Sequence, residues 1–451
     1  MKLIKHFDAF LANKVNLRQS RIDLLDDRVT AVENYLSSGD NVVADNFLEL
    51  IPQGSYAHRT IINPVQTNDE FDADVLLSMK EVEGWDAEDY VQQLYSVFRA
   101  EGGRYRDKVS RNKRCVKVDY ANEFHIDVVP YLERHDEHYI TNRETNEFEK
   151  TDPEGFNQWL DGKNRTANGH LVKVLRLLKF LRDHKNTFSV KSVILTILVG
   201  ERVNDVLIWG DPDYYKDVPT TLKNVLNDLD NYLQNYPETP PLVADPSCPT
   251  EDFNHRIDPD QYKNFVTKVA YYSQKVTEAF EEKDVEESKR KWRAIFGDDF
   301  GTYDTTTKSA LEAHKGRMGV KDTEETIEGR WGIPIQLDPK FKVRIGAQLQ
   351  KKTGFRHYEL GSHGNVVSRG RTINFRLSEV TVPAPFAVYW KVRNTGEEAI
   401  EADCIRGQVV EDDGTRTRSE PTTFRGSHFV ECYIVKDGVC VAKDRHSVII
   451  R

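Results

Sequence analysis

The spacing of apolar residues predicts a mainly helical chain, interrupted by short strands, up to about residue 300. Apolar positions recur at helical intervals in the first 50 residues, so this segment is expected to be helical. Two short runs, residues 71–77 and 124–129, are apolar with acids interspersed and are typical of strands. Further helices are predicted over residues 168–183, 190–199 and 260–296.

Beyond residue 335 the pattern is that of an all-β domain. Residues 297–335 are polar, rich in Gly and Thr and without clear periodicity, which indicates a domain boundary. Short apolar runs follow at 386–392, 429–435 and 439–442, separated by turn signals that include Asn394-Thr395-Gly396, Asp413-Gly414 and Asp437-Gly438. The predicted fold class is therefore α+β, ending in a small β-sandwich or a similar sheet domain.

Composition favours a globular protein from a reducing compartment. Of the 451 residues, 38% are hydrophobic and 30% are charged, and no stretch approaches the ~20 apolar residues that cross a bilayer. The N-terminus lacks the apolar core of a signal peptide. Five scattered cysteines without a CxxC pair argue against a disulfide framework or a zinc site. We expect a cytoplasmic protein with no membrane partner.

The net charge narrows the class of partner. A formal charge of −10 argues against a protein that coats nucleic acid, although it does not exclude an RNA partner. Basic residues are concentrated in residues 104–117, with seven bases and one acid, and in residues 163–191, with eight bases and one acid. Such a basic locality suits a compact anion such as a triphosphate. The alternative is that both stretches are ordinary solvated faces.

The sequence Asp72-Ala73-Asp74 on the first predicted strand carries the main chemical signal. Side chains alternate along a strand, so both carboxylates project from the same face. Two carboxylates a few ångströms apart repel each other and remain ionised together only with a cation between them. Oxygen ligands favour Mg²⁺ or Mn²⁺ over zinc. Taken alone, an Asp-x-Asp pair is more often a pair of surface or capping acids.

Two further elements complete a predicted nucleotide site. On the second strand, Ile126 and Val128 are expected to face the core, which leaves Asp127 on the other face beside the first pair. Three carboxylates from neighbouring strands can hold two metal ions about 3.5–4 Å apart. The Gly54-Ser55 turn can bring backbone N–H groups and a hydroxyl to phosphates. In this order, these elements predict nucleotidyl transfer.

Neighbouring residues offer alternatives. Asp119, eight residues before Asp127 and expected on the adjacent strand of a hairpin, is the rival for the third acid. Asp127 is preferred because its apolar neighbours bury the opposite face of the strand. His58 and Arg59 follow the turn and could contact substrate, but such residues more often decorate a loop, so they are left out of the predicted site.

The order Gly-Ser, Asp-x-Asp and a later Asp on an apolar strand resembles the motif of the DNA polymerase β-like nucleotidyltransferases. More narrowly, the chain resembles the bacterial cGAS/DncV-like cyclic-oligonucleotide synthases, relatives of animal cyclic GMP-AMP synthase and oligoadenylate synthase. The resemblance runs to about residue 300 and includes LVKVLRLLKFLRD and KWRAIFGDDF. It implies a polymerase β-like sheet with a helical domain, Asp72 and Asp74 as ligands of both metals, and Asp127 as the residue that helps to activate the acceptor hydroxyl.

Two more site residues are implied by the resemblance alone. Relatives place a lysine against the donor triphosphate where this chain has Lys179, and a serine near the same phosphates where it has Ser192. The alternatives are a solvated helix lysine and a helix cap or packed hydroxyl. In animal relatives an aromatic residue often follows the serine and stacks on a base. Here Val193 follows, so the resemblance gives no account of how the donor base is held.

The C-terminal part resembles the β-rich sensor domain fused to such synthases, through WKVRNTGEEA, IRGQ and FRGSHFVECYIVKDGVCVA. This resemblance implies a ligand-sensing role without identifying the ligand. Four residues could line a site there, although each is more often a fold-specifying residue: Trp390, Arg406, His428 and Glu431. The expected domains are a catalytic core at 1–165, a helical domain at 166–300, a linker at 301–334 and a sensor domain at 335–451.

The resulting hypothesis is an enzyme that uses two Mg²⁺ or Mn²⁺ ions to join nucleoside triphosphates, with ATP and GTP as candidates. The expected product is a cyclic di- or trinucleotide messenger in antiphage defence. A nucleotide-gated effector protein and an activating ligand at the C-terminal domain are implied partners. The alternatives are linear oligonucleotide synthesis, nucleotide transfer to an RNA end or a protein hydroxyl, and a non-catalytic nucleotide-binding module. The intact acids argue against the last, because an inactive site has no reason to keep like charges together.

Overall fold

The chain forms two compact units, residues 1–310 and 311–451, each described here by itself. A computed structural model describes residues 1–65, 71–120, 124–135, 137–303, 325–338, 340–350, 358–361, 365–394, 398–399, 402, 404 and 406–451. None of the described helices combines the length and apolar character needed to span a membrane. All five cysteines are free thiols.

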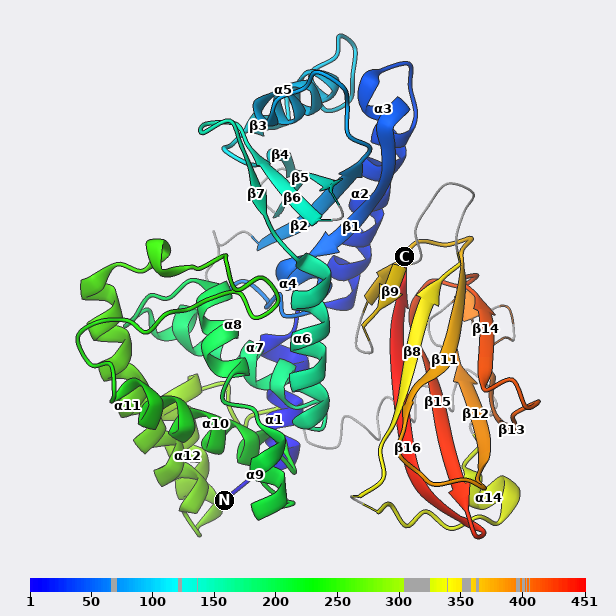
Figure 1. Cartoon of the computed structure of the whole chain (residues 1–451). Helices are drawn as coiled ribbons and strands as arrows, with labels where there is room; N and C mark the ends of the chain where they lie inside the picture. The colour runs from blue at the N-terminus through cyan, green and yellow to red at the C-terminus, as the bar shows by residue number, and fades with distance from the viewer. Residues whose placement is uncertain are drawn as a thin grey trace. The chain divides into compact units, whose positions relative to one another are not determined.

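The first unit combines a mixed sheet with a group of helices (Figure 1). Its strands are β1 (Phe47–Gln53), β2 (Phe71–Met79), β3 (Val109–Arg111), β4 (Val116–Tyr120), β5 (Phe124–Arg134), β6 (Glu137–Asn142) and β7 (Glu147–Lys150). Its helices are α1 (Ile4–Phe10), a π-helical turn (Leu11–Val15), α2 (Gln19–Ser37), α3 (Val42–Asn46), α4 (Gly54–Ala57), α5 (Ala87–Phe98), α6 (Pro153–Thr166), α7 (Leu171–Lys185), α8 (Ser192–Gly200), α9 (Asp205–Gly210), α10 (Val218–Leu233), a 3-10 turn (Asn254–Arg256), α11 (Pro259–Glu281) and α12 (Val285–Phe296).

The sheet has the strand order β1-β2-β5-β4-β3, and β6 pairs with β5 and β7. The two strands predicted from the sequence, β2 and β5, are central neighbours and pair in parallel. Their apolar positions alternate with polar ones as expected, so that Ala73 and Val75 on β2 are buried, as are Ile126 and Val128 on β5. Burial of this face fixes the register, because a shift by one residue would turn the apolar set toward solvent.

Two helix predictions need correction. The first 50 residues are not wholly helical, because residues 47–50 belong to β1, which pairs along the edge of β2. The predicted helix over 260–296 is two helices, α11 and α12. The break lies at Asp284, whose side chain caps α12 by accepting a hydrogen bond from the backbone N–H of Glu287 at 2.8 Å. The predicted α7 and α8 are present, each within a few residues of the expected limits.

The N-terminal helix packs with the helices at the other end of the first unit. Phe7 on α1 is fully buried and makes edge contacts with Trp292 on α12 and with Phe300, with ring centroids 4.8 and 5.0 Å apart. Phe10 contacts the ring of Phe180 on α7 at 5.3 Å. The chain therefore begins in the helical core, crosses to the sheet through α2 and returns through α6 (Figure 1).

The second unit is a β-sandwich with one short helix, α14 (Ile327–Trp331). One sheet has the order β10-β16-β15-β12-β13 and the other β14-β11-β8-β9. The strands are β8 (Val343–Leu349), β9 (Tyr358–Leu360), β10 (Asn365–Val367), β11 (Thr372–Val380), β12 (Ala387–Arg393), β13 (Arg406–Glu411), β14 (Thr417–Pro421), β15 (Gly426–Lys436) and β16 (Val439–Ile450). A core shared by both sheets confirms the predicted all-β class of this region.

Two of the three predicted turns in this unit can be located. Asp437-Gly438 joins β15 to β16, and both residues have positive φ, as a tight hairpin requires. Asp413-Gly414 connects β13 to β14, which belong to different sheets, so it is a crossing and not a hairpin. Thr395 and Gly396 of the third turn lie outside the described residues.

The four polar or aromatic residues singled out in this unit all serve the fold. Trp390 is buried and donates its indole N–H to Asp412 at 2.7 Å. Arg406 pairs with Glu420. The His428 ring lies 2.7 Å from the carbonyl oxygen of Phe424. The buried Glu431 carboxylate binds three side chains, those of Lys391, Tyr433 and Arg445.

The aromatic contact of α1 gives a stability prediction. Replacing Phe7 with Ala leaves a cavity against Trp292 and Phe300, so the free energy of unfolding should fall by about 3–5 kcal/mol. The measurement is the first transition in a urea titration followed by intrinsic fluorescence. Ile4→Ala, at an exposed position of the same helix, is the matched control and should change stability by less than about 0.5 kcal/mol. Equal effects of the two variants would contradict the docking of α1.

Candidate active site

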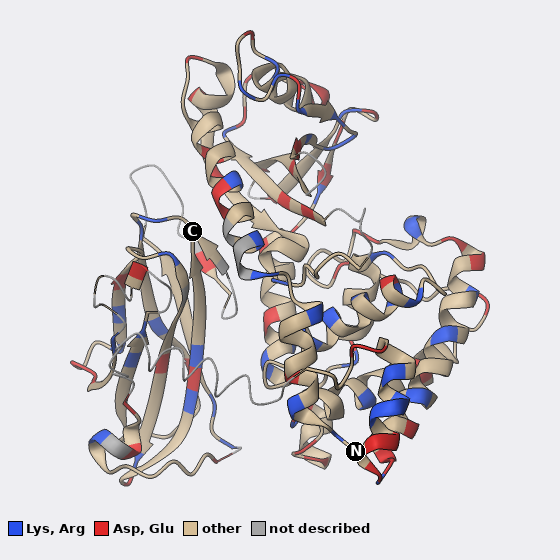
Figure 2. Ribbon diagram, turned by 180° about the vertical axis from the view of Figure 1, so that it is seen from behind, with Lys and Arg blue, Asp and Glu red and all other residues tan. Residues whose placement is uncertain are grey.

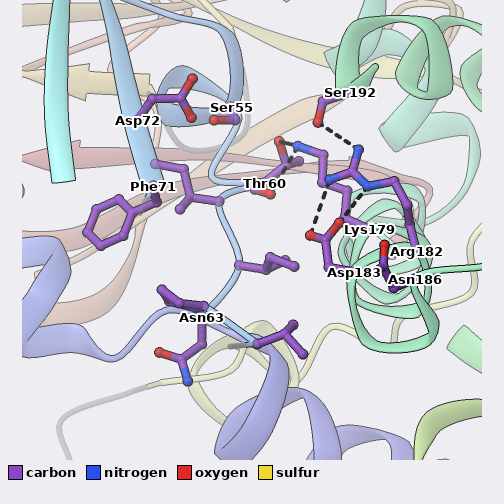
Figure 3. A pocket seen from close by; sticks show the side chains of 14 residues that line it. Ser55, Thr60, Asn63, Phe71, Asp72, Lys179, Arg182, Asp183, Asn186 and Ser192 are labelled. Atoms are coloured by element: carbon purple, nitrogen blue, oxygen red, sulfur yellow. Dashed lines mark hydrogen bonds and ion pairs between the residues drawn. The ribbon is translucent and has the colours of Figure 1, made fainter. Parts of the chain in front are cut away.

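A cleft of about 640 Å³ lies between the first residues of the central strand β2 and helices α7 and α8. It is lined by Ser55, Thr60, Ile61, Ile62, Asn63, Pro64, Val65, Phe71, Asp72, Lys179, Arg182, Asp183, Asn186 and Ser192. Ser55 and Asp72 point toward each other on one side, and Lys179, Arg182 and Ser192 lie on the other (Figure 3). Four of the seven predicted site residues therefore line one cavity of a size typical of ligand sites.

The three predicted acids lie side by side on β2 and β5. Asp72 and Asp74 project from the face of β2 opposite to buried Ala73. In the parallel pairing of β2 with β5, Asp74 is directly opposite Asp127. The rival acid, Asp119, lies one strand farther away on β4, where it pairs with Lys117 at 3.1 Å. The register thus gives Asp127 the place beside the Asp-x-Asp pair.

Electrostatics shows that these carboxylates interact. Burial, together with the negative charges of Asp72 and Asp127, raises the pKa of Asp74 from 3.8 to about 8. Burial also raises the pKa of Asp127, where the charge of Asp72 acts in the same direction and that of His125 opposes it. Without a cation, these pKa shifts favour a bound proton at this cluster near neutral pH, because burial disfavours the charged form of Asp74 and the neighbouring negative charges add to that effect.

The Gly54-Ser55 turn directly follows β1 and touches Asp74. Gln53, the last residue of β1, pairs with Asp74 across the sheet, so the chain leaves the strand at the level of the acids. Gly54 has φ +57°, and a Cβ atom there would lie 2.7 Å from Oδ2 of Asp74. Only glycine combines this backbone conformation with so close an approach to a carboxylate.

An ion pair anchors this turn to α2. The Asp26 carboxylate accepts a hydrogen bond from the Tyr56 hydroxyl at 2.6 Å and pairs with Arg59 at 3.1 Å. His58 is half-buried, with its ring 5.8 Å from that of Phe156, and desolvation lowers the pKa of the imidazole to about 4, so it is neutral at physiological pH. Neither His58 nor Arg59, which the sequence analysis left out of the predicted site, lines the cleft.

Lys179 is not a solvated helix lysine. Its side chain is 4% exposed, and Nζ donates to the carbonyl and hydroxyl oxygens of Thr60 at 3.2 and 3.1 Å. Burial and the neighbouring Arg182 lower its pKa to about 8, while Asp72 acts in the opposite direction. An ammonium group with two of its three protons fixed has one left to donate into the cleft.

Arg182 and Asp183 line the same wall but were not predicted. The Arg182 guanidinium binds both oxygens of Asp183 at 2.6 and 3.2 Å. It also donates to the Ser192 hydroxyl at 3.2 Å. A signal was available in the sequence, since these residues follow Lys179 at helical spacings of three and four and so share its face of α7. Thr60, Asn63 and Asn186 carried no such signal, because loop positions have no fixed spacing.

The acids have the chemistry of a magnesium site but are not gathered around a point. Among the described residues, no three His, Cys, Asp or Glu side chains form a ready cage for an ion. The donor set nevertheless fits, since it consists of carboxylate oxygens, and Oδ1 of Asp127 is buried without a hydrogen-bond partner. Mg²⁺ commonly takes only one or two carboxylates, and completes its shell with phosphates and water.

Only one of the two basic stretches predicted from the sequence contributes residues to the cleft. No residue of 104–117 lines the cleft, and its bases are spread from the connection between α5 and β3 to strand β4. Figure 2 shows basic residues in blue around this part of the sheet. Some of them contact that surface, as where Arg104 stacks on Tyr35 and Lys113 pairs with Glu144. From 163–191, by contrast, Lys179 and Arg182 reach the cleft. The proposed triphosphate-binding charge thus comes from the second stretch alone.

Comparison with protein families agrees with this geometry. Residues 1–164 match the Second Messenger Oligonucleotide or Dinucleotide Synthetase domain, and residues 321–451 match the Adenylyl/Guanylyl and SMODS C-terminal sensor domain. The chain carries the two domains of a cGAS/DncV-like nucleotidyltransferase. Both predicted resemblances, to the synthases and to their fused sensor domain, are confirmed.

Individual relatives of this nucleotidyltransferase are distant in sequence. A c-di-GMP synthase of Roseivirga ehrenbergii is 23% identical over 327 residues, which cover 64% of this chain and 83% of the relative. A cyclic AMP-AMP-AMP synthase of Acinetobacter is 22% identical over 301 residues, covering 63% of this chain and 85% of the relative.

Two solved structures share the fold of this nucleotidyltransferase. CdnC of E. coli MS115-1 with ATP has a TM-score of 0.52 and 18% identity, covering 66% of this chain and 98% of that chain. CdnG of Bradyrhizobium diazoefficiens with GTP has a TM-score of 0.53 and 17% identity, covering 69% of this chain and 98% of that chain. The predicted combination of a polymerase β-like sheet with helices is thereby confirmed.

The crowding of the acids predicts a pH-dependent stability. The folded-state pKa of Asp74 is raised from 3.8 to about 8. Its contribution to the free energy of unfolding is therefore complete below about pH 4 and is lost as the pH rises to about 8. Asp74→Asn should therefore raise the melting temperature of the metal-free protein at pH 8.5 and leave it almost unchanged at pH 4.5. Scanning calorimetry with EDTA tests this, with exposed Asp40→Asn as the control. If Asp74→Asn is no more stable than the wild type at pH 8.5, the proposed repulsion between the acids is contradicted.

The contact between Gly54 and Asp74 predicts a loss of activity without unfolding. In Gly54→Ala the new methyl group must displace the Asp74 carboxylate, and a misplacement of this kind costs about 10²-fold in kcat. Gly102→Ala is the matched control, because Gly102 also has a positive φ of +72° but has no atom within 4 Å of its Cβ position. Equal activity of both variants in a pyrophosphate-release assay would show that backbone strain, and not this contact, matters at Gly54.

Proposed function

We propose that this enzyme joins nucleoside triphosphates into a cyclic di- or trinucleotide and releases pyrophosphate. The observation that supports it is the opposition within one cleft of an acidic strand, through Asp72, and a cationic wall, through Lys179. A triphosphate bound across the cleft would meet hydroxyl and ammonium donors on one side and carboxylates on the other.

In the proposed reaction, a ribose hydroxyl oxygen of one nucleotide attacks the α-phosphorus of the other. The new P–O bond forms as the bond to the β-phosphate breaks, and pyrophosphate leaves. Lys179 and Ser192 hold the donor triphosphate, and the Gly54-Ser55 turn binds its phosphates from the other side. Asp127 orients the acceptor hydroxyl and draws its proton away. A second transfer, after the linear intermediate turns over, closes the ring.

Asp72, Asp74 and Asp127 are proposed to hold two Mg²⁺ or Mn²⁺ ions. When bound, such ions lower the pKa of the attacking hydroxyl and stabilise the charge on the leaving pyrophosphate. The raised pKa of Asp74 is consistent with this role, because a divalent cation would displace its proton and relieve the repulsion with its neighbours.

The relatives support a cyclic oligonucleotide as the class of product, but they do not indicate its bases or its ring size. One is named a c-di-GMP synthase and another a cyclic AMP-AMP-AMP synthase, so base and ring size both vary among proteins at similar distance. We propose a cyclic product from ATP, GTP or both, made as a messenger in antiphage defence that acts on a nucleotide-gated effector. We further propose that residues 335–451 respond to an activating ligand, and that the catalytic core and helical domain divide near residue 165.

The product assay tests this function. Purified protein is incubated with the four ribonucleoside triphosphates and Mg²⁺ or Mn²⁺, and the products are treated with phosphatase and identified by mass spectrometry. We expect a phosphatase-resistant cyclic nucleotide. Asp127→Asn should reduce turnover by more than about 10²-fold. Loss of a residue that only supports a metal ligand costs up to about 10²-fold in activity, and loss of a proposed ligand itself should cost more. Asp119→Asn, which alters the rival acid, should retain most of the activity.

The other outcomes are also informative. A product that loses terminal phosphates to phosphatase would indicate a linear oligonucleotide and overturn the cyclisation step. Loss of activity in Asp119→Asn with activity kept in Asp127→Asn would transfer the role of third acid to β4. Activity of Asp72→Asn equal to wild type at saturating metal would contradict the acidic strand as the catalytic centre.

A further inference from the structure

The cationic wall of the cleft contains an arginine whose contacts differ from those of a phosphate-binding residue. Arg182 is 18% exposed, and its guanidinium lies against Asp183, Ser192 and the carbonyl oxygen of Val190 (Figure 3). An arginine that bound phosphate directly would leave its planar fork free for two parallel hydrogen bonds. Here the edge of the fork that carries Nε and Nη2 is already occupied by the Asp183 carboxylate.

Few donors of Arg182 remain for a ligand. Of its five N–H groups, Nε binds Asp183, Nη1 binds both Val190 and Ser192, and Nη2 binds Asp183 again. One N–H of Nη2 is left over. The Asp183 carboxylate also offsets part of the charge of the guanidinium.

The contact with Ser192 has a directional consequence. Nη1 of Arg182 donates to the Ser192 hydroxyl oxygen at 3.2 Å, and a hydroxyl that accepts from a cation cannot donate its own proton back to that cation. Ser192 is the first residue of α8 and lines the cleft. Its proton is therefore available in the direction of the cleft, where Lys179 supplies the other donor.

Asp183 fixes this arrangement. A long arginine side chain beside a phosphate site would otherwise be free to move toward the phosphates and release Ser192. The two short contacts with Asp183, and the third with Val190 in the connection from α7 to α8, hold the guanidinium on the serine side. The pair thus converts a mobile cation into a fixed hydrogen-bond donor.

We propose that Arg182 is a positioning residue for nucleotide binding: held by Asp183, it orients the Ser192 hydroxyl as a donor to the triphosphate and does not bind the phosphates itself. This inference rests on the proposed function, because it assigns the cleft to a triphosphate. It adds that Arg182 contributes to the affinity for a nucleotide only by orienting the Ser192 hydroxyl.

A double-mutant cycle tests the inference. The probes are the four α,β-methylene nucleoside triphosphates, which cannot be turned over, titrated calorimetrically with Mg²⁺ into the full-length protein. Arg182→Gln and Ser192→Ala should each raise the Kd of the tightest-binding probe by about tenfold, the cost of one hydrogen bond to a charged group. The double variant should be no weaker than Ser192→Ala, because both changes remove the same contact.

Arg182→Lys separates positioning from charge. It keeps the positive charge but lacks the planar fork that binds Asp183 and Ser192 together. We expect it to bind as weakly as Arg182→Gln, and to have no effect in the Ser192→Ala background. Wild-type affinity in Arg182→Lys would mean that charge acts directly on the phosphates and would overturn the proposal. Additive losses in the double variant would overturn it as well.

Controls distinguish this failure from others. Lys185→Gln, which removes a cation from the last turn of α7 but does not line the cleft, should leave the Kd unchanged. Thermal unfolding of each variant separates loss of affinity from loss of the α7–α8 connection, and Ser192→Ala keeps the other contacts of Arg182 intact. If the wild type binds none of the four probes, the proposed function fails. If it binds one but the cycle shows no coupling, only the role of Arg182 fails.

Discussion

The negative charges on β2 and β5 are held together by the hydrophobic effect. Ala73 and Val75 are buried on one face of β2, and the residues flanking Asp127 are buried on β5, so the acids cannot turn away without exposing apolar side chains. Parallel pairing then sets Asp74 opposite Asp127. Core packing thus imposes both the burial and the repulsion that raise the pKa of Asp74, and a proton or a cation relieves the repulsion.

The rest of the cleft is arranged around these acids on β2 and β5. Gly54 brings the turn after β1 into contact with Asp74, and the pairing of Arg59 with Asp26 holds that turn against α2. Two residues beyond His58 the chain begins to line the cleft, and Thr60 there binds Lys179 of α7. The same short segment therefore touches the acids at one end and the cationic wall at the other, which ties the two sides of the site together.

Periodic features of this chain could be predicted from the sequence, and contacts between distant segments could not. The alternation around Asp72 and Asp127 predicted two strands and the face of each that carries the acids, because side chains alternate between the two faces of a strand. Strand β1 was missed, since its residues 47–50 continue an apolar pattern that also suits a helix. Lys179 was placed by resemblance, but its burial against Thr60 depends on a loop that lies 119 positions earlier in the chain. Arg182 and Asp183 were overlooked because a helical basic residue beside an acid is usually a surface pair.

The charge balance of the cleft implies that nucleotide and metal bind together. Because Arg182 is already paired with Asp183, Lys179 is the main cation that the helical wall offers to a ligand, and burial lowers its pKa. A triphosphate would bring several negative charges toward Asp72, so one lysine cannot offset the added repulsion. A divalent cation alone meets three acids that are not gathered into a cage, and so lacks ligands that phosphate oxygens would supply. Each ligand would thus provide what the other needs, so the proposed function favours binding of the metal-nucleotide complex over binding of either component alone.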